Sequence, residues 1–215
     1  MKNNFFLKTT THKVISWQGK IIVLAAMILM IWLCWPLIRI CVTNYISYED
    51  ERVPGSHVVV ENWDGQIDIF EGSAKVASSI GATEIASIIF EDSYQDTRKR
   101  KAYLLNAWAA GIDTTQFILI PVPRREPKTL NIARAVLDTA HQRHWTEITI
   151  VTFELHSARS RKAYLLVAKP RNISIHIAGI AMEDVTAQNW TTTSSGLAAA
   201  FSEMIKKIYY DVVVF

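Results

Sequence analysis

Two short segments combine basic, acidic and imidazole side chains in a pattern that suits proton transfer and anion binding. The first reads PRREPKTLN and spans residues 123–131, and the second reads ELHSARSRK and spans residues 154–162. Histidine is the residue type most often used for proton transfer, and Glu126 supplies a carboxylate, so His156 and Glu126 form a candidate acid–base pair. Solvated charges on surface helices are the alternative interpretation. The candidate ligand-binding residues nearby are Thr129, Asn131, Thr152 and Arg159.

Each segment lies between a predicted strand and a predicted helix. The apolar runs FILIPV at 117–122 and ITIVTF at 148–153 are typical of buried strands. Helical spacing of apolar residues follows at 129–144 and at 158–168, where Ser157 is the expected N-cap. Free backbone N–H groups and the helix dipole favour an anion at such a helix start. We therefore expect a phosphate or carboxylate ligand near these two segments.

The same alternation of strand and helix runs through most of the chain. Further strands are predicted at 57–60, 84–90 and 173–178, and further helices at 67–80, 98–110 and 196–209. Such alternation predicts βαβ units, and strands that are apolar on both faces require helices on both sides. Residues 57–215 are thus predicted to form a three-layer, doubly wound, mostly parallel α/β domain of Rossmann-like type. In this class, ligands bind at the carboxyl ends of the strands, where the strand order reverses.

The N-terminal region has the composition of a membrane anchor. Residues 21–38 read IIVLAAMILMIWLCWPLI without a charged side chain, which gives roughly 27 Å of helix. We predict a transmembrane helix over 21–43, with the lipid bilayer as its partner, and a polar stalk over 44–56. A cleaved signal peptide is the rival interpretation. It fits less well, because the apolar run is long and no A-x-A-like cleavage site follows it.

Charge is distributed unevenly about this anchor. Residues 1–20 contain four lysines and no acidic residue, whereas Glu49, Asp50 and Glu51 follow the span. By the positive-inside rule the N-terminal segment is cytoplasmic and the domain extracytoplasmic. Five of the 23 basic residues belong to the anchor and its flank. The domain thus has 18 basic and 20 acidic residues. It is slightly acidic and lacks the excess of basic residues that is typical of nucleic-acid-binding proteins.

Cysteine usage excludes two further classes of site in the domain. The two cysteines, Cys34 and Cys41, lie in or beside the predicted span. The domain therefore has neither a disulfide framework nor a thiolate zinc site. The sequence predicts no metal site and identifies no cofactor.

Three short motifs resemble those of the YdcF/SanA/ElyC-like family. They read E-x-x-T-x-N, V-T-x-x-x-H-x-x-R and W-x5-G-x6-E-x2-K. Their residues are Glu126, Thr129 and Asn131; Val151, Thr152, His156 and Arg159; and Trp190, Gly196, Glu203 and Lys206. The resemblance implies a Rossmann-like domain and a role in the bacterial cell envelope, in peptidoglycan or polysaccharide precursor metabolism. It also implies a single-pass protein of the bacterial inner membrane.

Two glycine-rich turns expected of that family are replaced here. The segment Val58–Gly65 reads VVVENWDG, and Ile88–Gln95 reads IIFEDSYQ. Glycines in such turns let backbone N–H groups approach a phosphate, whereas Glu61, Glu91 and Asp92 add negative charge. We expect these acids to repel an anion from that half of the cleft. The ligand then differs, or acids such as Asp64 hold a cation, or the site is degenerate.

Two functional hypotheses follow. In the first, a membrane-anchored envelope protein binds, and transforms, a phosphorylated or nucleotide-like small molecule. His156 and Glu126 would then carry the acid–base chemistry, and Arg159 with Thr129 would hold the anion. In the second, the chain is a non-catalytic accessory subunit of a membrane-bound machine for polysaccharide synthesis or export.

Overall fold

The computed structural model describes residues 17–62, 65–115, 117–182 and 185–214, which form two compact units, residues 1–40 and 41–215. The first elements are α1 (Trp17–Ile46), β1 (His57–Val60), α2 (Ile67–Ile80), β2 (Ile85–Phe90), α3 (Glu91–Gln95), α4 (Thr97–Ala109) and β3 (Phe117–Val122). The remaining elements are α5 (Lys128–Gln142), β4 (Glu147–Phe153), α6 (Glu154–Ala168), the 3-10 helix η1 (Lys169–Arg171), β5 (Ser174–Ile180), α7 (Ser194–Tyr209) and the π-helical turn η2 (Tyr210–Val214).

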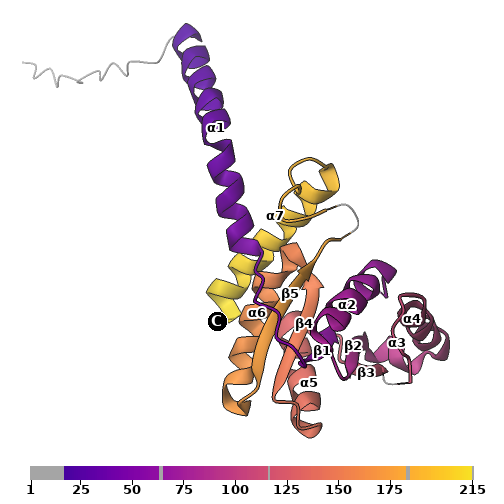
Figure 1. The fold of residues 1–215 in the computed structure, drawn as a ribbon. Coiled ribbons are helices and arrows are strands. Elements are labelled where there is room, and N and C mark those ends of the chain that lie inside the picture. The colour runs from indigo at the N-terminus through magenta and orange to yellow at the C-terminus, as the bar shows by residue number, and fades with distance from the viewer. Residues whose placement is uncertain (1–16, 63–64, 116, 183–184, 215) are drawn as a thin grey trace, which may run out of the picture. The chain divides into compact units, whose positions relative to one another are not determined.

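The five strands form one parallel sheet in the order β3-β2-β1-β4-β5 (Figure 1). From β1 the chain winds outward through β2 to β3, then crosses back to β4 on the other side of β1. The strand order therefore reverses between β1 and β4, where a doubly wound sheet binds its ligands. The predicted α/β class and the doubly wound parallel sheet are confirmed.

Helices cover both faces of the sheet. Neighbouring residues of β1 point to opposite faces, so Val59 packs with α5 and α6, whereas Val58 and Val60 pack with α2 and α4. Leu137 of α5 and Phe70 of α2 are both fully buried. This two-sided burial explains why the strands read as continuous apolar runs.

Two local features differ from the sequence-based prediction. Helix α6 begins at Glu154 directly after β4, so Ser157 lies inside the helix and its predicted N-cap role is wrong. Its Oγ instead donates to the Glu154 carbonyl at 2.6 Å and accepts from the Tyr48 N–H at 2.6 Å. The unpredicted helix α3 follows β2 without a loop, which puts Glu91 and Asp92 on an exposed helical turn.

Helix α1 is long and apolar enough to cross a membrane by its length and composition. It contains the predicted span at 21–43 and continues to Ile46, while the first sixteen residues, with Lys2, Lys8 and Lys13, lie outside the described residues.

The segment predicted as a stalk is bonded to the α/β domain. The Asp50 N–H donates to the Ile177 carbonyl at 2.9 Å, and the Asp50 carboxylate accepts from the Ile177 N–H at 3.0 Å. Ile46 is buried in an apolar cluster with Leu155 and Trp190. The end of α1 and the segment after it are therefore part of the unit that contains the domain.

Candidate functional site

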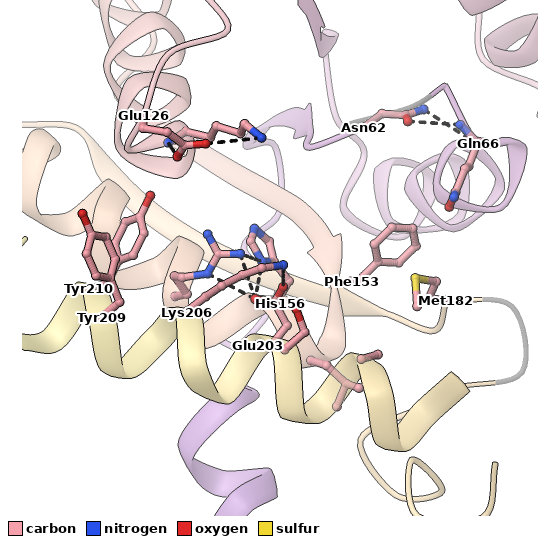
Figure 2. Close-up of a pocket in the computed structure, with 15 residues that line it drawn as sticks. Asn62, Gln66, Glu126, Phe153, His156, Met182, Glu203, Lys206, Tyr209 and Tyr210 are labelled. Atoms are coloured by element: carbon pink, nitrogen blue, oxygen red, sulfur yellow. Dashed lines mark hydrogen bonds and ion pairs between the residues drawn. The ribbon is translucent and has the colours of Figure 1, made fainter. Parts of the chain in front are cut away.

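A pocket of about 540 Å³ opens at the carboxyl edge of the sheet, beside the ends of the neighbouring strands β1 and β4. Helix α7 forms one wall, and the segments that follow β1, β3 and β4 form the others (Figure 2). The polar residues in its lining are Asn62, Gln66, Glu126, Lys128, His156, Arg159, Ser202, Glu203 and Lys206.

His156 lies between two carboxylates that come from opposite ends of the domain sequence. Its side chain is buried, with Nδ1 3.0 Å from Oε2 of Glu203 and Nε2 3.8 Å from Oε2 of Glu61. Burial alone would raise the pKa of Glu203. The charge and hydrogen bond of His156, together with Arg159, outweigh burial and hold that pKa well below its usual range. Glu203 is therefore a permanent carboxylate that orients the imidazole.

The guanidinium of Arg159 donates hydrogen bonds to side chains inside the protein. Its Nε and Nη2 donate to Oε2 of Glu203 at 3.1 and 2.8 Å, and its Nη1 donates to the Thr129 hydroxyl. The guanidinium also lies over the Tyr210 ring, 5.3 Å from its centroid. This buried side chain thus joins the start of α5 to α6 and α7, and it acts as a positioning residue.

The Nδ1 atom of His156 has two alternative partners. It lies 2.7 Å from Nη2 of Arg159, a donor, as well as 3.0 Å from the Glu203 carboxylate, an acceptor. A protonated Nδ1 donates to Glu203, and a deprotonated Nδ1 accepts from Arg159. The imidazole therefore has a hydrogen-bond partner at Nδ1 in either protonation state, which suits a group that exchanges protons.

Glu61 lies in the core beneath this imidazole rather than in the cleft. The side chain is fully buried, and its Oε2 accepts from the Ser160 hydroxyl at 2.5 Å. Burial and the nearby Glu61 carboxylate raise the pKa of Tyr164 well above its usual value. Glu61 was expected to repel an anion from its half of the cleft; its carboxylate is buried and faces Ser160 and His156, so it does not line the pocket.

Asn62 shapes the turn that replaces the glycine-rich one. Its Oδ1 accepts from the N–H groups of Gly65 and Gln66 at 2.6 and 3.1 Å. Gly65 has φ +73°, and a Cβ there would lie 3.0 Å from the Tyr103 ring. The side chain of Asn62 thus takes up backbone donors that a glycine turn would offer to a ligand.

Glu126 lines the pocket but pairs with Lys128 rather than with His156. Its exposed carboxylate accepts from the Lys128 N–H at 3.2 Å and lies 3.3 Å from the Lys128 ammonium. Figure 2 shows His156 and Glu203 turned toward each other, with Glu126 set apart from them. The carboxylates paired with the imidazole are those of Glu203 and Glu61 rather than that of Glu126.

The other predicted ligand-binding residues take different positions. Thr129 is buried and reaches the site through its bond to Arg159. Thr152 is buried too, and its hydroxyl has no hydrogen-bond partner among the described residues. Asn131 donates to the Arg125 carbonyl at 3.0 Å, on the exposed start of α5. Of the six predicted residues, the pocket lining includes His156, Glu126 and Arg159.

The site contains residues that the sequence-based assignment missed. Glu203 and Lys206 belong to the C-terminal motif, and the Lys206 ammonium lies 2.8 Å from Oε1 of Glu203. The Tyr210 hydroxyl accepts from the Thr129 N–H at 3.1 Å. The spacing of Glu203 and Lys206 on one helix was the available signal, whereas nothing local distinguished Glu61.

A metal centre finds no support in the part of the chain that the structure describes. No three His, Cys, Asp or Glu side chains come together there in a group that could hold an ion. Asp64, which the sequence offered as one ligand of a cation site, lies outside the described residues.

Comparison with known proteins adds little to this geometry. No family model matches the sequence, and no curated protein matches it. A solved structure of a universal stress protein in complex with cAMP is similar over 58% of this chain and 98% of that chain, with 17% identity and a TM-score of 0.36. A likeness this low carries no ligand or function to the present chain.

Proposed function

We propose that this chain is a membrane-anchored protein of the bacterial cell envelope whose α/β domain binds a phosphorylated or nucleotide-like small molecule. The observation that carries the proposal is the pocket at the carboxyl ends of β1 and β4, in which His156 is oriented by the Glu203 carboxylate. Pockets of this volume at the switch point of a parallel sheet are the usual ligand sites of the fold. The envelope role rests on the resemblance to the YdcF/SanA/ElyC-like family and on the apolar helix α1.

The anion is held by the rim of the pocket rather than by Arg159. Lys128 and Lys206 line the pocket, and their side chains are 43% and 51% exposed, so both ammonium groups can turn toward a ligand. Leu155 and His156 lie in the first turn of α6, whose backbone N–H groups and dipole favour negative charge. Two cations and one helix start can together hold one phosphate.

His156 then moves a proton at the bound ligand. Its Nδ1 donates to Glu203 when protonated and accepts from Arg159 when not, so this nitrogen keeps a hydrogen-bond partner in both states. Glu126, bonded to Lys128, orients that cation at the rim. In this assignment His156 is the acid–base group, and Glu203 and Arg159 position it.

Ligand binding is tested on the full-length protein in detergent, by calorimetric titration with nucleotides, nucleotide sugars and sugar phosphates. We expect a member of this panel to bind, and Lys128→Ala with Lys206→Ala to weaken it at least about tenfold, the effect of losing about 1.4 kcal/mol of ion contact. Lys99→Ala with Lys101→Ala on exposed α4 is the matched control. Equal affinity in both double variants would overturn the proposed site.

The proton-transfer step is tested separately with His156→Gln, which keeps a polar side chain. We expect this variant to bind the ligand within a few-fold of wild type and to lose turnover. Unchanged turnover would remove His156 from the chemistry while leaving the binding proposal intact.

A second candidate function is favoured by one observation. The cation that an anion-binding catalyst would use, Arg159, is bonded to Glu203 and Thr129. This arrangement suits a non-catalytic accessory subunit of a membrane-bound polysaccharide synthesis or export machine. It predicts co-purification with a membrane partner after cross-linking and no thermal shift with the ligand panel.

The orientation of the anchor belongs to the same proposal. Lysines before the span and acids after it favour a cytoplasmic N-terminus and an extracytoplasmic domain. Protease added outside intact spheroplasts should degrade the domain. Protection of the domain would indicate the opposite topology, with the domain in the cytoplasm.

A further inference from the structure

Helix α7 presents three faces with different surroundings. One face, with Ser202, Glu203 and Lys206, lines the pocket. A second face packs Ala200 into the apolar cluster that contains Ile46. The third, which we call the outer face, consists of Leu197, Phe201, Ile205 and Ile208.

The outer face is a continuous apolar stripe. Its residues are 42–60% exposed and recur at spacings of three and four, as on one side of a helix. Beyond the helix, Val212 and Val213 are exposed as well. The charged side of the helix, with Glu203 and the half-exposed Lys206, faces the pocket. An apolar face opposite a charged face is the composition of helices that lie in a membrane interface.

The second face of α7 shares an apolar cluster with the end of α1. Val42, Tyr45 and Ile46 pack in the same cluster as Ala200 and Met204 of α7. The Tyr45 hydroxyl also donates to the Asp211 carboxylate at 2.7 Å, just after α7. These contacts lie within the unit 41–215, so they tie α7 to the last turn of the apolar helix.

Chain continuity limits how far α7 can lie from a bilayer. The uncharged run ends at Ile38, and Val42 and Ile46 follow it by about 6 and 12 Å of helix. Headgroups and interfacial water occupy a layer of about 5–8 Å on each side of the hydrocarbon. The apolar cluster that joins Val42 to residues of α7 therefore lies at the depth of that layer or just outside it.

We propose that the outer face of α7 docks on the bilayer that α1 spans, as an interfacial amphipathic helix. The inference depends on the membrane anchoring in the proposed function but not on the ligand. Exposed Leu105 and Trp108 on α4 make an instructive contrast, because that helix has no member in the cluster around Ile46. Docking would hold one wall of the pocket against the membrane surface.

The test uses the full-length chain in nanodiscs of phosphatidylcholine and phosphatidylglycerol. Cys34 and Cys41 are replaced by serine, and a fluorophore is attached through Met30→Cys, Phe201→Cys, Ile205→Cys or Leu105→Cys, one at a time. The probe at 30 reports the span, those at 201 and 205 report the outer face, and that at 105 is the matched exposed control. We expect doxyl lipids to quench the probes at 201 and 205 several-fold more than the probe at 105.

Each other outcome overturns the inference in a distinguishable way. If doxyl lipids quench the probe at residue 30 but quench the probes at 201 and 205 no more than the probe at 105, docking of α7 is ruled out and the membrane anchor stands. Absence of quenching at 30 removes the anchor and the inference together. Shielding of 201 and 205 from aqueous iodide without quenching by doxyl lipids assigns the outer face to a protein surface, either a second copy or another subunit.

Discussion

The starts of α5 and α6, which the sequence predicted as anion sites, differ in their surroundings. The start of α6 is buried, with His156 and Arg159 bonded to Glu203 and Thr129. The start of α5 remains at the rim, where Glu126 and Lys128 pair with each other in solvent. Similar residue types in similar loops therefore serve different purposes, one as a rigid charged core and the other as an adjustable rim.

The difference arises from what packs against each start. Helix α7 packs against the start of α6 and brings Glu203 to it, whereas Glu126, in the segment just before α5, lies at the pocket opening. A charge taken out of water requires a partner, and a charge left in water does not. Mutations at the α6 start should therefore affect stability strongly, and mutations at the α5 rim should affect mainly ligand binding.

The largest effect is expected from Glu203→Ala. It leaves the guanidinium of Arg159 buried without its carboxylate, a loss of about 3–5 kcal/mol in the free energy of unfolding. Urea unfolding of the full-length protein in detergent, followed by tryptophan fluorescence, measures it. Lys206→Ala removes only an exposed partner of the same carboxylate and should cost about 1 kcal/mol or less.

A paired replacement shows whether the loss comes from the unpaired charge. Arg159→Met combined with Glu203→Met removes both charges and should recover much of the stability lost in Glu203→Ala. If Glu203→Ala is as stable as wild type, the buried pair is not formed and the contrast between the two helix starts fails.

The same carboxylate should give the protein an acid-sensitive stability. The pKa of Glu203 is lowered in the fold, so its contribution is complete above its unfolded value of 4.5 and is lost as the pH falls below that value. Unfolding free energy measured from about pH 5 to about pH 3 should therefore fall more steeply in wild type than in Glu203→Gln. Asp211, whose pKa is lowered to about 2, adds a slope that both proteins share.

A smaller effect is expected from Thr129→Val. The substitution keeps the shape of the side chain but removes an acceptor for buried Arg159, at a cost of about 1.5–3 kcal/mol. Asn131→Ala, two residues on and half-buried, loses only hydrogen bonds that lie at the surface, so it is the matched control and should cost about 1 kcal/mol or less. Equal losses in the two variants would mean that the start of α5 is not divided into a buried and an exposed side.

The smallest effect on stability is expected from Glu126→Gln, within about 0.5 kcal/mol of wild type. Its side chain is 76% exposed, and its ion pair with Lys128 lies in solvent. Melting temperature and ligand affinity measured together sharpen the comparison, because the substitution should change affinity through Lys128 without changing stability. A large destabilisation would show that the rim is as rigid as the core.

The fold was predictable because apolar patterning is a local signal. The strand at 117–122 and the helix at 67–80 were predicted with the bounds that the structure has. Helix α3 was missed because five residues, Glu91–Gln95, are too few for a helical period to register. Ser157 failed as a cap because β4 leads into α6 without a loop, which a preference for serine at helix starts cannot reveal.

The site was only partly predictable because its pairing is tertiary. His156 was found from its own chemistry, but Glu203 lies 47 residues further along the chain and reaches it only after α7 has packed. Glu61 was predicted only as a negative charge in the cleft, since nothing in VVVENWDG indicates that Ser160 and His156 would enclose its carboxylate. Residue type indicates what a side chain can do, and burial determines which partner it has.

The contacts at the end of α1 also set the order in which the chain can finish folding. The Trp190 indole donates to the Thr43 hydroxyl at 2.8 Å across 147 residues, and Tyr45 bonds to Asp211 across 166. The contacts of Thr43 and Tyr45 can therefore form only after Trp190 and Asp211 have been synthesised. Contacts between residues so far apart in the sequence form slowly. A nascent chain whose α7 is still inside the ribosome carries His156 without Glu203, so the imidazole gains its orienting carboxylate only after α7 has emerged.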